Sequence, residues 1–122
     1  MILVAETVAE MENYARGFAN RVRSGMVILL QGDLGAGKST FARALIRALS
    51  GVEGLEVPSP TFTLVQTYDT VSGPVHHFDL YRLDDPEEIW PLGWEDATAQ
   101  DAVAIVEWPE RLGPYRPAKA VE

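Results

Sequence analysis

The chain has 122 residues and a formal net charge of −8, and 47% of its residues are hydrophobic. This length and composition fit a single domain with a substantial apolar core. The sequence contains no cysteine, which excludes a disulfide framework and a thiolate metal site. Its ten Lys and Arg residues are scattered, so nucleic-acid binding by this chain alone is disfavoured. Because we find no charged-then-apolar leader and no bilayer-spanning apolar run, we expect a soluble cytoplasmic protein.

After a short apolar run over residues 1–5 that could form an edge strand, the sequence predicts a helix over residues 8–22. Apolar residues recur there at helical spacing, and Ser24-Gly25 is a typical helix stop. Thr7 and Glu10 fit a capping box at its start. We interpret the apolar stripe as core.

Residues 32–39 read Gly-Asp-Leu-Gly-Ala-Gly-Lys-Ser and match the phosphate-binding pattern G-x-x-x-x-G-K-S. The apolar run 26–30 before them predicts a buried strand, and an apolar stripe at helical spacing follows over residues 41–49. In the order strand, glycine loop, helix, this motif cradles phosphate with backbone N–H groups. The same context disfavours the alternative, a glycine-rich turn that caps an ordinary helix.

The residue types in this loop indicate what each position does. Lys38 should reach the β and γ phosphates, Ser39 should ligate magnesium, and Thr40 could contact an inner phosphate. In this segment the predicted nucleotide-binding residues are Asp33, Leu34, Gly35, Ala36, Gly37, Lys38, Ser39 and Thr40.

Residues 57–63 read Val-Pro-Ser-Pro-Thr-Phe-Thr, and the two prolines hold this stretch extended. One interpretation is a stiff loop ahead of a strand. The other is a switch loop in which the hydroxyl of Ser59 or Thr61 senses magnesium or the γ-phosphate.

Two strands, over residues 62–68 and 75–81, are separated by turn residues and predict an antiparallel hairpin. On alternating strand geometry His77, Asp79 and Tyr81 share one face, opposite His76 and Phe78. Adjacent histidines on a regular strand cannot both point into one metal site, which disfavours zinc. A His and an Asp on a strand are more often structural than catalytic, but the phosphate loop moves this pair towards the active site.

The last predicted strand, over residues 101–107, is apolar and ends in Glu107. A strand that ends in an acid is the pattern of a Walker B element, which places a carboxylate beside magnesium and the attacking water. Before it, residues 84–88 predict a helix start, with Pro86 near the first turn. Together these elements predict a three-layer α/β domain of the P-loop NTPase type over residues 1–112. Its mixed sheet is parallel around the phosphate loop, and residues 113–122 form a Pro-rich, poorly ordered tail.

Four segments occur together in this short chain: Gly32 to Ser39, Ser59-Pro60-Thr61-Phe62-Thr63-Leu64, His77-Phe78-Asp79-Leu80-Tyr81-Arg82 and Glu107-Trp108-Pro109. In this order the set resembles the TsaE family, formerly YjeE. Its members are small bacterial P-loop ATPases required for the threonylcarbamoyladenosine modification of tRNA. The resemblance implies weak ATP hydrolysis alone, stimulation by the partners TsaB and TsaD, and resetting of that complex by hydrolysis. Contact with tRNA would then be indirect, through the complex.

Carried over residue by residue, the resemblance implies that Lys38, Glu107 and Asp79 are catalytic. Magnesium would be held by Ser39, Glu107 and Asp79, and Thr61 would lie in a switch-like loop beside ATP. We expect Glu107 rather than Asp79 to orient the attacking water, because Glu107 ends a buried apolar strand.

Family members usually continue past the Glu-Trp-Pro motif into a further strand, whereas no strand pattern follows Leu112 here. We therefore expect an open sheet edge that could allow self-association. Two other functions remain open at this point. One is a small P-loop phosphotransferase, and the other is a nucleotide-sensing interaction module that binds ATP without hydrolysing it.

Overall fold

The structure is a computed structural model that describes residues 8–30, 36–52, 55–58, 64–70 and 73–115, with the side chains of all of these except 8–12 and 36–39. Its centre is a four-stranded sheet in the spatial order β1-β4-β3-β2. The strands are β1 (Val27–Leu30), β2 (Val65–Thr70), β3 (Gly73–Asp79) and β4 (Val103–Glu107). Strands β1, β4 and β3 run parallel, and β2 pairs antiparallel with β3. The α/β class and the mixed sheet with a hairpin are therefore as expected.

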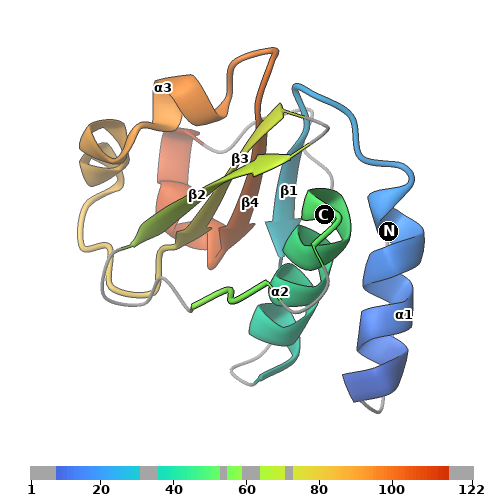
Figure 1. Ribbon diagram of the computed structural model, residues 1–122. Coiled ribbons are helices and arrows are strands. Elements are labelled where there is room, and N and C mark those ends of the chain that lie inside the picture. Colours follow the sequence, from blue (N-terminus) through green and yellow to red (C-terminus); the bar gives the residue numbers. More distant parts are fainter. Residues whose placement is uncertain (1–7, 31–35, 53–54, 59–63, 71–72, 116–122) are drawn as a thin grey trace.

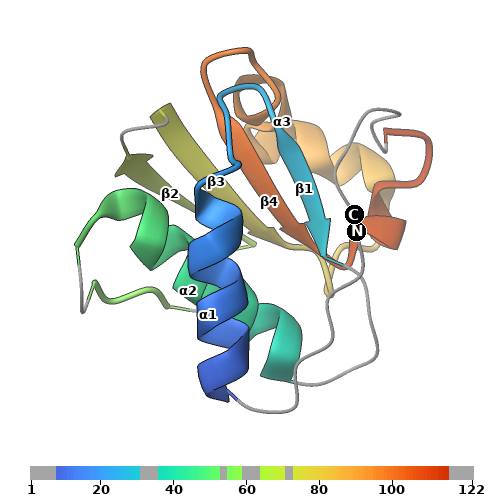
Figure 2. The same cartoon turned by 90° about the vertical axis from the view of Figure 1, so that its right-hand side faces the viewer.

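Helical elements cover both faces of the sheet (Figures 1 and 2). One face carries α1 (Val8–Ala19) and α2 (Ala36–Ser50). The other carries η1 (Pro86–Leu92), α3 (Trp94–Ala97) and η2 (Pro109–Tyr115), of which η1 and η2 are short 3₁₀ helices. Helix α1 ends at Ala19, earlier than expected, and Val22 is still buried beyond the helix end.

Two apolar cores lie on the two sides of the sheet. Alternate residues of β4 enter opposite cores: Val103 and Ile105 face α1 and α2, whereas Ala104 and Val106 face η1 and α3. This strand is therefore buried on both faces, as parallel strands usually are, which explains why its sequence is continuously apolar.

The hairpin lies a few residues away from where the sequence placed it. The paired ends of its strands are Thr70 and Gly73, and β3 ends at Asp79, so the expected extension of this strand to Tyr81 was wrong. Gly73 has a φ of 101°, and an added Cβ would lie 2.2 Å from the carbonyl oxygen of Asp101. Only glycine fits this close approach, which allows β3 to begin at Gly73.

The expected helix start at residues 84–88 is present. Asp85 is the N-cap of η1, and its side-chain oxygen accepts a hydrogen bond from the Glu87 N–H at 3.0 Å. At the other end of the domain, η2 runs to Tyr115, past Leu112, where we expected the domain to end. In the described part of the chain, no helix has both the length and the apolar character needed to cross a bilayer.

Candidate nucleotide-binding site

The strand and the helix expected on either side of the phosphate loop are both present. Strand β1 ends at Leu30 and α2 begins at Ala36, so the first residues of this helix belong to the predicted loop motif. A helix start presents unpaired N–H groups and the positive end of the helix dipole, both of which attract phosphate. Residues 32–35, and with them Asp33, Leu34 and Gly35, lie outside the described residues, as does Thr61.

The remaining loop positions lie at the start of α2. Gly37, Lys38 and Ser39 belong to its first turn, and their side chains are outside the described part of the structure. Thr40 follows them and is half-buried. The strand and the helix thus follow one another as expected, and the contacts of Lys38 and Ser39 stay a prediction.

Two acidic side chains come together at the carboxyl edge of the parallel strands. Leu30, the last residue of β1, pairs with Glu107 on β4, and Glu107 in turn pairs with Asp79 on β3. Glu107 is 2% exposed and Asp79 is 5% exposed. Because β1 leads directly towards the predicted phosphate loop, both carboxylates lie at the edge of the sheet where that loop begins.

The carboxylate of Glu107 has a buried partner in His77 of β3. The His77 Nε2 and Glu107 Oε2 atoms are 2.6 Å apart, and the two side chains are 1% and 2% exposed. His77 pairs with Ile105 in the strand register, so its side chain reaches diagonally to Glu107, two residues after Ile105 on the same face of β4. The sequence placed His77 and Asp79 on one face but could not show that His77 contacts Glu107.

Asp79 ends β3 and makes local hydrogen bonds there. Its Oδ1 accepts from the Tyr81 N–H at 3.1 Å, which turns the chain at the strand end. Its own N–H donates to the carbonyl oxygen of Leu64 at 3.0 Å. Leu64 has an unusual φ of 70° and is the first described residue after Thr61. Leu64, which directly follows the stretch interpreted as a switch loop, is therefore tied by its backbone to Asp79.

Trp108 follows Glu107 and has a φ of 60°, which is rare for a bulky residue. Its ring lies 5.1 Å from the Tyr81 ring, measured between centroids. No feature of the sequence indicates this backbone conformation, because tryptophan does not favour it. Residues held in such conformations often lie at functional sites.

The acidic pair fits magnesium. Mg²⁺ in nucleotide sites usually binds one or two carboxylates together with waters and phosphate oxygens. Glu107 and Asp79 supply two carboxylates on adjacent strands. No cluster of three or more His, Cys, Asp or Glu side chains suited to a metal occurs among the described residues, and a nucleotide-bound Mg²⁺ does not require one.

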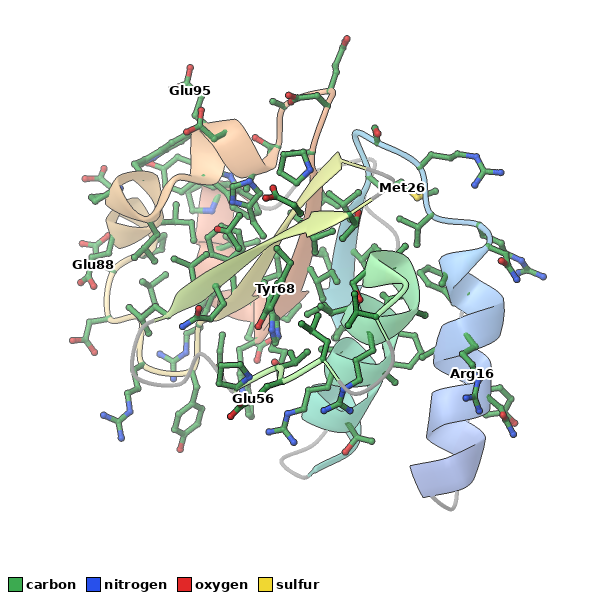
Figure 3. The ribbon with its side chains drawn as sticks, viewed as in Figure 1. Arg16, Met26, Glu56, Tyr68, Glu88 and Glu95 are labelled. Atoms are coloured by element: carbon green, nitrogen blue, oxygen red, sulfur yellow. The ribbon has the colours of Figure 1, made fainter. Side chains whose placement is uncertain are left out.

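Tyr68 of β2 adds a buried polar group on the α2 side of the sheet. Figure 3 shows its side chain running from β2 toward the end of the sheet at which the β1 arrow points. Burial raises the pKa of the Tyr68 phenol above its usual value. Its hydroxyl oxygen and the His77 Nδ1 are the two buried side-chain polar atoms without a hydrogen-bond partner in the described part of the structure.

Comparison with known proteins gives a consistent result. The family model described as "Threonylcarbamoyl adenosine biosynthesis protein TsaE" matches residues 5–122. The TsaE protein of Rickettsia bellii is 41% identical over 113 residues, which cover 93% of this chain and 77% of that protein. The Haemophilus influenzae TsaE protein is 43% identical over 86 residues, or 70% of this chain and 53% of that protein.

A solved structure agrees with these relatives. The crystal structure of Bacillus subtilis YdiB superposes with a TM-score of 0.73 at 29% identity, over 95% of this chain and 69% of that one. The chain therefore matches part of the length of each of these proteins. The resemblance inferred from the four sequence motifs is confirmed: this chain belongs to the TsaE family of tRNA threonylcarbamoyladenosine biosynthesis proteins.

Proposed function

We propose that this chain binds ATP with Mg²⁺ and hydrolyses it, as the ATPase subunit of the machinery that makes threonylcarbamoyladenosine on tRNA. The observation that carries this proposal is the register that aligns Leu30, Glu107 and Asp79 at one edge of the sheet. ATP hydrolysis at a phosphate-binding loop uses an acidic residue for magnesium and a residue that orients the attacking water, and this acidic pair can supply both. Family membership supplies the tRNA context.

In this proposal the first turn of α2 and the loop before it hold the phosphates. Lys38 neutralises charge on the β and γ phosphates, and Ser39 supplies a hydroxyl to magnesium. Glu107 and Asp79 would hold the magnesium, and Glu107 would also orient the attacking water. When bound, magnesium would supply positive charge against the charge that develops on the transferred phosphoryl group. The hydroxyl of Thr61 senses the γ-phosphate.

The partners in this proposal are TsaB and TsaD, with hydrolysis resetting their complex between turnovers. A net charge of −8 suits a subunit that leaves contact with tRNA to other chains. The proposed location is the cytoplasm. Any self-association would use an outer strand of the sheet, which in the described part is β1 or β2.

The test is magnesium-dependent ATP hydrolysis by the chain alone and with purified TsaB and TsaD. We expect weak activity alone and strong stimulation by the partners. Glu107→Gln should keep nucleotide binding and lose hydrolysis by about 10²- to 10⁴-fold, because a carboxylate that positions water contributes on that scale. Lys38→Ala should lose both binding and hydrolysis.

Two outcomes would overturn the proposal, and a third would reassign one role within it. Tight ATP binding with no hydrolysis in any mixture would make the chain a nucleotide sensor. Transfer of phosphate to a small acceptor in preference to water would make it a phosphotransferase. Normal hydrolysis by Glu107→Gln would move the water-orienting role to Asp79 or to a partner.

A further inference from the structure

We propose that His77 is a positioning residue for the hydrolytic step: it fixes the carboxylate of Glu107 in the orientation that water attack requires. This inference rests on the proposed ATPase function and adds a residue that the sequence motifs left without a role. His77 does not touch the nucleotide in this proposal. It acts through Glu107 alone.

The contact has the geometry of a strong, enclosed hydrogen bond. The Nε2-to-Oε2 distance of 2.6 Å is at the short end for a bond between a ring N–H and a carboxylate. Both side chains are almost fully buried, so bulk solvent does not compete for the Nε2–Oε2 bond. A bond of this kind holds one Glu107 oxygen in place and thereby fixes the direction in which Oε1 points.

The positions of the two residues explain why His77 can do this. It lies on β3, next to β4, and on the same face as Glu107, so both side chains point into the layer between the sheet and α2. Val75, two residues before His77 on β3, and Ile105, which pairs with His77 on β4, are completely buried on that face. The ring is therefore held by packing from rigid strands, which suits a group that must position another one.

The carboxylate shows which group His77 must offer, and the second ring nitrogen makes no competing bond to a described residue. Nδ1 is buried and has no hydrogen-bond partner in the described part of the structure. In a neutral imidazole one nitrogen donates and the other accepts, and a carboxylate needs a donor. The contact therefore requires an N–H at Nε2, which is donated to Glu107.

The alternative is that His77 only satisfies a buried carboxylate for the sake of folding. His77→Leu removes the donor at similar bulk, and His77→Gln returns an N–H donor that can reach Glu107. In the partner-stimulated reaction, we expect His77→Leu to lower kcat by about 10- to 100-fold, the cost of small misplacements in active sites. The KM for ATP should change less than about twofold, because uniform nucleotide binding is untouched. His77→Gln should restore most of kcat.

His76→Leu is the matched control. It is the neighbouring histidine on the opposite face, where its ring lies 6.5 Å from the Phe78 ring, and its loss should leave kcat and KM unchanged. A fluorescent ATP analogue bound with normal affinity by His77→Leu would show that this variant is folded.

A double variant separates positioning from general structural damage. If His77 acts through Glu107, then adding His77→Leu to Glu107→Gln should cost less than about twofold further in kcat, because the group it positions is already gone. Independent damage would multiply the two losses instead. Proton and nitrogen NMR of the ring offers a readout that needs no turnover: the Nε2–H signal of His77 should shift in Glu107→Gln and stay in place in His76→Leu.

The results distinguish failure of this inference from failure of the proposed function. Unchanged kcat in His77→Leu, or multiplied losses in the double variant, would overturn the positioning role while leaving the ATPase intact. If the unaltered chain hydrolyses no ATP even with its partners, the proposed function fails, and the positioning role fails with it.

Discussion

Trp108 offers a sharp test of backbone strain beside the candidate site. Its φ of 60° is costly for any residue with a Cβ, by about 1–2 kcal/mol, and it precedes Pro109, which restricts the backbone further. We compare Trp108→Gly with Trp108→Ala, because both lose the same ring contacts with Tyr81. Glycine relieves the strain, but the greater entropy of its unfolded chain costs the folded state about 0.5–1 kcal/mol. The glycine variant should therefore be more stable than the alanine variant by about 0.5–1 kcal/mol.

The reference position is Arg16, which is exposed on α1. There Arg16→Gly should be less stable than Arg16→Ala by about 1 kcal/mol, the ordinary helix penalty. The sign of the glycine-minus-alanine difference therefore reverses between the two positions. Urea unfolding measures it, with the fluorescence of Trp90 and Trp94 as the probe in all four variants. If Trp108→Gly is less stable than Trp108→Ala by as much as Arg16→Gly is less stable than Arg16→Ala, backbone strain at Trp108 is refuted.

The remaining predictions concern two glycines and one histidine. Gly73→Ala should destabilise the protein by about 2 kcal/mol or more in urea unfolding, because the new Cβ would meet the Asp101 carbonyl oxygen. Gly17→Ala should instead stabilise α1 by about 0.5–1 kcal/mol, because a Cβ at this position meets nothing within 4 Å in the described part of the structure. Equal effects of the two substitutions would contradict the close approach at Gly73. Burial lowers the pKa of His76, and the nearby charge of Asp96 offsets only part of this, so the unfolded chain binds more protons as the pH falls. The free energy of unfolding should therefore be highest above the unfolded pKa of about 6.5 and should decrease as the pH falls below that value. His76→Gln should flatten this pH dependence, and an unchanged slope in that variant would contradict the assignment to His76.

Local patterns in the sequence were enough to predict most of the elements. The apolar run that became β1, the helical stripe of α2 and the alternation in β3 each depend on neighbours within a few residues. The boundaries were less secure, as β3 shows. It was expected to reach Tyr81 but ends at Asp79, because Asp79 turns the chain by accepting from the Tyr81 N–H.

Strand order could not be predicted in this way. The sequence placed Glu107 at the end of a strand and Asp79 on another, but it did not show that β4 inserts between β1 and β3. That insertion depends on burying both faces of β4 at once, which is a property of the assembled layers. It is what brings Glu107 between Leu30 and Asp79.

Residue types at short spacing establish the phosphate-loop motif, the acid at a strand end and the family to which the chain belongs. The contact between His77 and Glu107, which are 30 residues apart, and the positive φ of Trp108 appear only in the folded chain. The physical reason is that long-range register and backbone strain arise only when separate segments pack together. No local pattern records which oxygen a buried imidazole will reach.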